Sequence, residues 1–235
     1  MQQRSAKAHG VEGAITDEAI EAARRRIGIE MPEPRPGWEY ADVDPIRNYT
    51  EGIGDLNPLY REQDYARKTR WGDLIAHPTM MLYMGVSGKK ELSPEERERG
   101  RGGGMAGVHA FYSGDDIHWF RPIRRGDRLT VRTGLSKVDP KVSRMSGTRA
   151  VHMTTDHVYR NQLGELVGVR HTLQIRVERQ SAREAGKYKD IKIQTYTPED
   201  MARIDADYER EEVRGAKPRY WEDVVVGEEI TPVVK

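Results

Sequence analysis

Apolar and polar residues alternate in four stretches of the second half of the chain. The stretches cover residues 107–119, 127–138, 143–160 and 165–178, and short polar or glycine-bearing segments separate them. Alternation with a period of two, in runs that contain many Val, Ile, Thr and Tyr residues, predicts β-strands. Such long strands, joined by short links, favour a twisted antiparallel meander.

The last stretch predicts a sheet with one apolar face. One side of this strand carries Val167, Val169, His171, Leu173, Ile175 and Val177, and the other side carries Leu166, Gly168, Arg170, Thr172, Gln174 and Arg176. An apolar face needs a cover, and segment 78–88 is the strongly apolar helical pattern that can supply it. We therefore predict the α+β class, with a long antiparallel sheet wrapped around a central helix at 78–88.

The regions before and within this domain have different characters. Thr16 and Gly28 are expected to begin and end a first helix, and the proline-rich segment after it indicates an extended connector. Residues 1–37 are therefore predicted to form an N-terminal helix and linker. Residues 38–179 are predicted to form the domain that contains the sheet and its helix.

Residues 180–235 differ from the rest of the chain in their high charge. Thr197, followed by Pro198, is a strong helix start, but the apolar stripe of that helix is narrow. The stripe consists of Met201, Ile204 and Tyr208. The final stretch turns β-like again, so we expect a charged helical extension that ends in a β-like segment.

Composition narrows the classes of protein to consider. The 235 residues include 39 Lys and Arg against 38 Asp and Glu, a formal net charge of +1, so no strong attraction to nucleic acid or to an anionic membrane is expected. The absence of cysteine excludes disulfides, thiolate metal sites and cysteine nucleophiles. No apolar run approaches the ~20 residues of a membrane-spanning helix, and the N-terminus lacks the apolar stretch of a secretory signal. We expect a cytoplasmic protein.

One segment has a specific chemical pattern. Residues 47–83 read RNYTEGIGDLNPLYREQDYARKTRWGDLIAHPTMMLY. This string resembles the signature of the MaoC-like, or (R)-specific enoyl-CoA hydratase (hydratase 2), family, in which a Gly-Asp-x-Asn-Pro-x-His loop precedes Ile-Ala-His-Gly. The similarity continues through PIRRGDRL and VYRNQLGELV and covers about residues 38–179. It implies a hot-dog fold, which agrees with a sheet wrapped around a helix.

The resemblance implies addition of water across the 2,3 double bond of an acyl-CoA, or the reverse reaction. This chemistry needs an acid–base pair beside the bond and hydrogen-bond donors for an enolate-like thioester oxygen. Asp55 matches the acidic position of the family, but Tyr60 replaces its histidine, and a phenol with a pKa near ~10 is a poor base. Pro78 replaces a glycine and lacks the N–H of one expected donor. Asp55, Tyr60 and His77 are the catalytic candidates.

The candidate contacts to substrate follow from the same resemblance. They are Asn57, Pro58, Pro78, Thr79, Met81, Met84, Arg124 and Arg125. The loop and the helix start would hold the thioester, the methionines the acyl tail, and the arginines the phosphates of CoA. Each group also has a structural explanation: a turn capped by Asp55, a buried hydrogen-bonded phenol at Tyr60, a helix-start histidine at His77, and a solvated turn at the arginines.

Neither a cofactor nor a metal is predicted. The CoA thioester is the substrate itself, and the other histidines are scattered over predicted strands without the spacing of zinc ligands. The chain therefore has to act through its own side chains or those of a partner.

Three functions remain open from the sequence. The main hypothesis is the acyl-binding hot-dog component of an enoyl-CoA hydratase or 3-hydroxyacyl-CoA dehydratase, with acyl-CoA as ligand. The replacements at Tyr60 and Pro78 affect the acid–base and oxyanion groups and leave the acyl-binding scaffold intact, so a second hot-dog subunit would carry the Asp/His pair. A homodimer is the alternative assembly. A self-sufficient hydratase that uses Asp55 with His77 or Tyr60 is the second hypothesis. A non-catalytic acyl-CoA-binding scaffold is the third.

Overall fold

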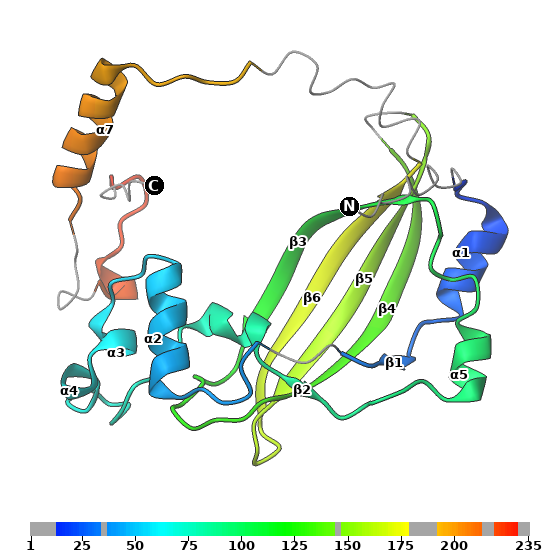
Figure 1. Cartoon of the computed structure of the whole chain (residues 1–235), viewed down its shortest axis with the longest axis horizontal. Coiled ribbons are helices and arrows are strands. Elements are labelled where there is room, and N and C mark those ends of the chain that lie inside the picture. Colours follow the sequence, from blue (N-terminus) through cyan, green and yellow to red (C-terminus); the bar gives the residue numbers. More distant parts are fainter. Residues whose placement is uncertain (1–12, 34–36, 144–146, 179–191, 213–218, 230–235) are drawn as a thin grey trace, which may run out of the picture.

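The molecule is organised around one six-stranded sheet with short helices on one of its faces (Figure 1). The computed structural model describes residues 13–33, 37–143, 147–178, 192–212 and 219–229. In chain order the elements are α1 (Asp17–Arg24), β1 (Glu30–Met31), α2 (Val43–Gly52), α3 (Pro58–Arg61), α4 (Gln63–Ala66), η1 (Pro78–Tyr83), β2 (Val86–Ser87), α5 (Pro94–Arg99), β3 (His109–Trp119), β4 (Thr130–Val142), β5 (Arg149–Arg160), β6 (Leu166–Val177), α7 (Pro198–Glu209) and η2 (Trp221–Asp223).

The strand order is β1-β4-β5-β6-β3, and β2 also pairs with β4. The antiparallel pairs β4–β5 and β5–β6 confirm the meander for three of the four predicted strands. The first predicted strand differs, because β3 pairs with β6 at the far edge and does not lie beside β4. The connection of residues 120–129 is long enough to cross the end of the sheet, and it buries Ile123 and Leu129 in the core.

The predicted central helix at 78–88 is much shorter in the structure. Residues Pro78–Tyr83 form a 3₁₀ helix, and Met84 is already extended. Gly85 explains the end of the helix: its φ of 110° lies in a region that favours glycine. A Cβ at this position would lie 2.9 Å from the Cβ of Val131. The chain therefore turns here against β4, and residues 86–87 continue as β2 in parallel with that strand.

The helix η1 covers the opposite face of β6 from the one that the alternation predicts. A Cβ on Gly168 would lie 2.7 Å from Sδ of Met81, so η1 packs against the side that carries Gly168, Arg170 and Thr172. The apolar row from Val169 onward therefore faces away from η1, whereas Val167, beside the register shift at Tyr159/Arg160, is buried in the same cluster as Met81. Some polar side chains on the covered face pair with one another, because Arg170 forms an ion pair with Asp115 and Thr172 donates to the same carboxylate.

Two hydrophobic clusters lie on this covered face. The first combines η1 and α2 with the adjoining ends of β4, β5 and β6, and the second is built around α1. Ile20 and Ala23 of α1 pack in one cluster with Val151 and Met153 of β5. The N-terminal helix, capped by Thr16 as predicted, therefore shares the core of the sheet.

A band of polar side chains crosses the covered face between the two clusters. The strand register places Thr133, His157 and Arg170 in one row across β4, β5 and β6. The next row contains Thr155, Thr172 and Asp115. We call these six residues the polar belt. It replaces the continuous apolar surface that would accompany a long central helix.

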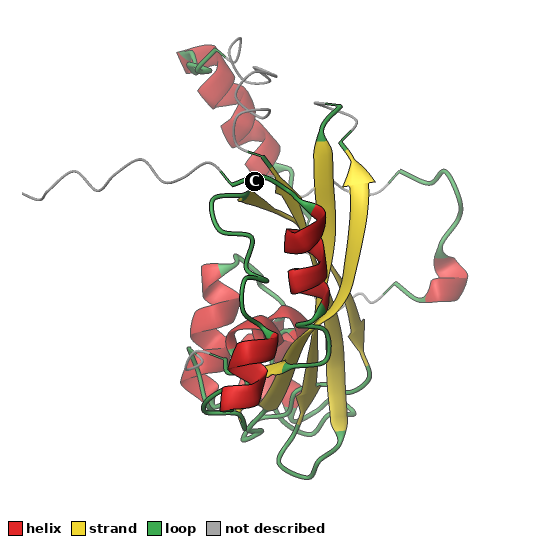
Figure 2. Cartoon of the chain, turned by 90° about the vertical axis from the view of Figure 1, so that its right-hand side faces the viewer, coloured by secondary structure: helices red, strands yellow, loops and turns green. Residues whose placement is uncertain are grey.

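The C-terminal helix is present but packs little of its surface. Thr197 caps α7 through a capping box, as predicted, and no residue of α7 is buried. Figures 1 and 2 show this helix standing away from the sheet. The β-like expectation for the end of the chain differs from the structure over 219–229, where η2 and turns are found, while 230–235 lie outside the described residues. None of the described helices is long and apolar enough to cross a bilayer.

Candidate functional site

The loop after α2 folds around hydrogen bonds from its own polar side chains. Asp55 Oδ1 accepts a hydrogen bond from the N–H of Asn57 at 2.8 Å, and Asn57 Oδ1 accepts one from the N–H of Leu59 at 3.0 Å. Pro58 is the first residue of α3, where its missing N–H costs nothing. Asn57 and Pro58 thus shape the turn, and one oxygen of Asp55 is engaged in the same task.

The second oxygen of Asp55 faces His77. Oδ2 lies 3.6 Å from Nε2 of His77, and the two side chains are only 30% and 22% exposed. The N–H of Thr79 donates to Nδ1 of His77 at 3.3 Å. Because Nδ1 then acts as an acceptor, the neutral ring carries its hydrogen on Nε2, toward the carboxylate. The fold thus brings together Asp55 and His77, which are 22 positions apart in the sequence.

Tyr60 completes this group of side chains. Its ring packs edge-on against His77, with centroids 5.3 Å apart. Burial, and then the charge of Asp55, raise the pKa of Tyr60 above 10.0. Burial lowers the pKa of His77 below 6.5, against the opposing effect of Asp55. Both rings are therefore neutral near pH 7, and neither is a ready proton donor.

The first turn of η1 offers no free backbone donor. Pro78 has no N–H, and the N–H of Thr79 is used by His77 Nδ1. The N–H of Met80 donates to the carbonyl of His77 at 2.9 Å. The side chain of Thr79 is engaged as well, since its Oγ1 lies 2.8 Å from the hydroxyl of Tyr49.

Two residues that contact this turn, Tyr49 and Trp119, were not among the candidates predicted from the sequence. Tyr49 reaches Thr79 from α2, and Trp119 Nε1 donates to the carbonyl of Pro78 at 3.1 Å from the end of β3. Tyr49 follows Ile46 by three residues on the buried side of α2, a spacing from which its inward direction is predictable. No pattern in the sequence predicts the contact of Trp119 with Pro78, because that contact depends on how β3 ends beside η1.

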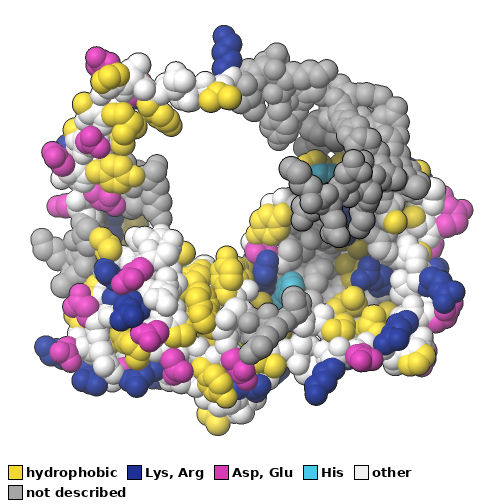
Figure 3. All heavy atoms as spheres, viewed as in Figure 1, with side chains coloured by type: hydrophobic (Ala, Val, Ile, Leu, Met, Phe, Trp, Pro, Cys, Tyr) yellow, Lys and Arg dark blue, Asp and Glu magenta, His cyan; other side chains and the backbone are white. Residues whose placement is uncertain are grey.

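Both predicted methionine contacts belong to the first hydrophobic cluster, but of the two only Met84 lines the cavity at the end of η1. Met81 is fully buried in the first hydrophobic cluster, against Gly168. Met84 lines a cavity of about 200 Å³ between the end of η1 and the sheet. Figure 3 shows hydrophobic side chains around η1 and the adjacent end of β3, where Tyr83 and Trp119 are exposed.

Most arginines of the connection between β3 and β4 are already paired with carboxylates. Their ion pairs are Arg121–Glu165, Arg125–Asp73, Arg128–Glu39 and, at the start of β4, Arg132–Glu30. Arg124 differs, because it has no carboxylate side chain as a salt-bridge partner in the part of the chain that the structure describes. Its Nη1 donates to the carbonyl of Trp71 at 3.2 Å.

A cavity of about 310 Å³ is lined by Arg121 and by Trp71, whose carbonyl Arg124 contacts. Trp71, Pro78 and Trp119 are among the residues that line it, so it reaches the N-terminal end of η1 beside His77. The guanidinium of Arg124 lies 5.9 Å from the ring centroid of Trp71. An aromatic wall and an available cation therefore occur together next to the Asp55–His77 pair.

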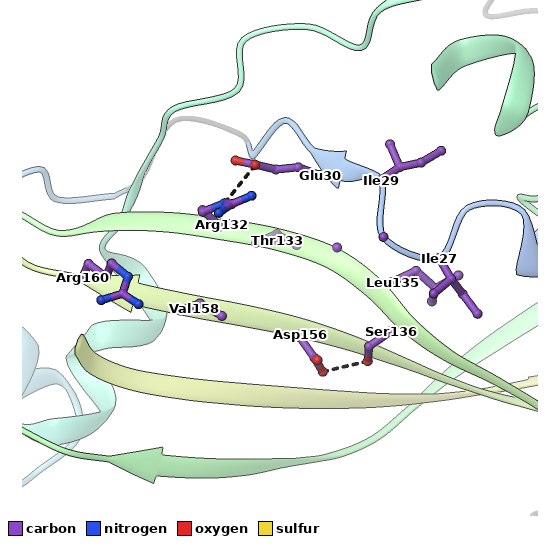
Figure 4. Close-up of a pocket in the computed structure, with 12 residues that line it drawn as sticks. Ile27, Ile29, Glu30, Arg132, Thr133, Leu135, Ser136, Asp156, Val158 and Arg160 are labelled. Carbon is purple, nitrogen blue, oxygen red and sulfur yellow. Dashed lines mark hydrogen bonds and ion pairs between the residues drawn. The ribbon is translucent and has the colours of Figure 1, made fainter. Parts of the chain in front are cut away.

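A third cavity, of about 430 Å³, lies on the other side of the molecule beside β1 (Figure 4). Glu30 pairs with Arg132 and Ser136 donates to Asp156 on its wall. No predicted site residue lines this cavity. A search of the described residues also finds no group of three or more His, Asp or Glu side chains that is able to hold a metal ion.

Comparison with known proteins agrees with the architecture. The model of the FAS1-like, dehydratase domain region family matches residues 39–170. A crystal structure of the ChsH1-ChsH2 complex from Mycobacterium tuberculosis matches with a TM-score of 0.51 at 20% identity, over 69% of this chain and 98% of that chain. At this identity the match speaks for the fold alone, and the hot-dog prediction is confirmed.

Two curated proteins are similar in sequence. A "Probable enoyl-CoA hydratase alpha subunit" of Thermomonospora curvata is 29% identical over 150 residues, which are 60% of this chain and 46% of that protein. A "UPF0336 protein" of Streptomyces griseus is 27% identical over 141 residues, 60% of this chain and 85% of that protein. The chain thus matches about half the length of the first of these relatives.

Proposed function

Since the chain belongs to the FAS1-like dehydratase domain family, we propose that it is a hot-dog component of an enoyl-CoA hydratase or 3-hydroxyacyl-CoA dehydratase. In this proposal it binds the acyl-CoA and needs a catalytic partner. The similarity to a hydratase alpha subunit supports the reaction class. The loop at Asp55 and the helix start at His77, which resemble the family's site, supply the scaffold for the thioester.

The main support for the proposal is that the first turn of η1 has no free N–H group. An enolate-like oxygen has to receive hydrogen bonds as its charge develops. Pro78 has no N–H, and the N–H groups of Thr79 and Met80 are committed to His77. Tyr60 stays a neutral phenol at the position of the family's histidine. The chain therefore retains a site of the right shape with weak catalytic groups, which favours binding over turnover.

The partner would dock on the free edge of β3. Among the described strands β3 pairs only with β6, so no described strand occupies the N–H and C=O groups of its other edge. Edges of this kind pair readily with another strand. Exposed Phe111 and Tyr112 add apolar area beside that edge. A second hot-dog subunit with an intact Asp/His pair fits this surface; a second copy of this chain is the alternative.

The CoA moiety would lie on the Arg124 side of η1. A thioester at Thr79 places the rest of the CoA arm in the adjacent cavity of about 310 Å³, along Trp71 and Pro78. Arg124 is a cation available for a phosphate, while Arg125 is held by Asp73 and fixes the connection. The acyl chain would then extend toward the other end of η1, where Met84 lies.

One observation favours a second candidate, a hydratase that acts without a partner. The Asp55 carboxylate and the His77 ring lie 3.6 Å apart and partly shielded from water, an arrangement in which the carboxylate is able to serve as a general base. The weak point is the proton for C2, because His77 is neutral and Tyr60 is a weaker acid than an ordinary phenol.

The experiment compares the full chain alone and with its partner. Hydration of trans-2-octenoyl-CoA is followed by loss of the enoyl absorbance, and binding of octanoyl-CoA is measured by calorimetry. We expect the chain alone to bind the ester but to turn over far below ~10 s⁻¹, the ordinary enzyme value. Turnover of that order by the single chain refutes partner dependence. Binding without turnover, even beside a hot-dog chain that carries the intact family loop, identifies a non-catalytic scaffold.

A further inference from the structure

The cavity of about 200 Å³ at the C-terminal end of η1 has a polar wall. Residues 82–85 form one side of it, and His157, Tyr159 and Arg170 of the sheet form the other. His157 and Arg170 belong to the polar belt, whereas Tyr159 belongs to the first hydrophobic cluster. Asp55 and His77 lie at the opposite end of η1, and a 3₁₀ helix of this length spans about 12 Å. A medium-length acyl chain covers that distance.

His157 is held so that one ring nitrogen stays available. Its Nδ1 lies 2.9 Å from Oγ1 of Thr133 and 3.5 Å from Oε1 of Glu33. The hydrogen bond from His157 lowers the pKa of Glu33 below 4.5, so Glu33 is an acceptor and Nδ1 carries the hydrogen. With that hydrogen on Nδ1, Nε2 of the neutral tautomer is an acceptor. The side chain of His157 is only 14% exposed.

Arg170 is held in the same way from the other side. Its Nε lies 2.8 Å from Oδ1 of Asp115, and the two side chains are 19% and 9% exposed. Asp115 is oriented in turn by hydrogen bonds from Thr172 at 2.7 Å and Tyr112 at 2.8 Å. This carboxylate neutralises Arg170 but does not use all five of its N–H groups. The cavity therefore holds donors and an acceptor, both fixed in position.

We propose that this cavity receives the far end of the acyl group and selects an acyl chain that bears a neutral oxygen function, a hydroxyl or a ketone, over a plain hydrocarbon chain. The inference rests on the proposed function, because it takes the thioester to lie at Thr79. A hydrocarbon end would cover the polar groups of His157 and Arg170 without replacing their hydrogen bonds to water, which is costly. A carboxylate end would be repelled by Glu33, whereas the charge of Arg170 is already compensated by Asp115.

The test uses the full chain and three esters of equal length: octanoyl-CoA, ω-hydroxyoctanoyl-CoA and the corresponding (ω−1)-ketone. Calorimetry measures the affinity of each. We expect the oxygenated esters to bind about fivefold more tightly, the effect of one net hydrogen bond. The two oxygenated esters separate a donor from a pure acceptor: His157 favours the hydroxyl, and Arg170 accommodates either.

The His157→Leu variant should reduce the preference, because it removes the acceptor and one of the two polar groups that a hydrocarbon end would cover; the hydroxy ester should lose more than the keto ester, which Arg170 still serves. His171→Leu is the matched control, because His171 lies on the opposite face of the sheet, paired with Asp156. Thr133→Val, which conserves shape, provides a second test if His157→Leu does not fold by circular dichroism; it should reduce the preference.

Equal affinity for all three esters in the wild type, or a preference that is undiminished in His157→Leu, overturns the inference and leaves the proposed function intact. Failure of every CoA ester to bind overturns both.

Discussion

The double variant Tyr60→His, Pro78→Gly should gain hydration activity that neither single variant reaches. An imidazole at position 60 has a pKa near ~6.5 and would face Asp55 and His77, and acid–base catalysis of this kind is worth about 10² in rate. A glycine at position 78 supplies an N–H at the start of η1, and one oxyanion donor is worth about 10². Independent gains would multiply to about 10⁴, but both sites adjoin His77, so we expect about 10³ over the wild type.

The assay is hydration of trans-2-octenoyl-CoA by the purified chain, with kcat determined for the wild type, both single variants and the double variant. Tyr65→His is the control, because it places an imidazole on α4, outside the Asp55–His77 site. Replacing proline by glycine costs about 1 kcal/mol through the greater freedom of the unfolded chain, so thermal unfolding has to confirm that each variant is folded. A folded double variant no faster than the wild type refutes the view that these two positions account for the weak catalysis.

Three further predictions test the packing, the titration and the charge of the site. Gly168→Ala should destabilise the fold by about 1–3 kcal/mol in urea unfolding, because its Cβ would meet Met81 Sδ at 2.7 Å; Gly88→Ala, where a Cβ meets nothing within 4 Å, should change stability by less than ~0.5 kcal/mol. Burial lowers the pKa of His77 below 6.5, so the unfolded chain gains this proton before the folded chain does as the pH falls. The contribution of His77 to the free energy of unfolding is therefore complete above pH 6.5 and is lost as the pH falls toward the lower pKa of the folded chain. His77→Gln should remove this part of the pH dependence of unfolding. Arg124→Gln should weaken octanoyl-CoA binding severalfold, less so at high salt, whereas Arg125→Gln should bind almost as the wild type does, and equal losses for the two variants contradict the assignment of the phosphate to Arg124.

Local patterns in the sequence were sufficient for much of the secondary structure. Thr16 caps α1 and Thr197 caps α7 because a side-chain oxygen that accepts from a nearby N–H acts over three residues. Alternation located the strands for the same reason, since each strand responds to the period of its own side chains. The family-like string also indicated the loop at Asp55 and the turn at His77, whose side chains the fold then brings within 3.6 Å.

Only the tertiary structure decided which face of the sheet is covered and where the central helix stops. The row with Gly168 looks polar along its own strand, but Asp115 of β3 forms an ion pair with Arg170, and the absence of a side chain at Gly168 admits Met81. Gly85 ends η1 because Val131, 46 positions later in the sequence, leaves no room for a Cβ. The hydrogen bonding in the first turn of η1 has the same origin, since the N–H of Thr79 donates to the ring of His77. These outcomes depend on contacts between residues distant in sequence, and the residue pattern of one segment does not determine which distant residues contact it.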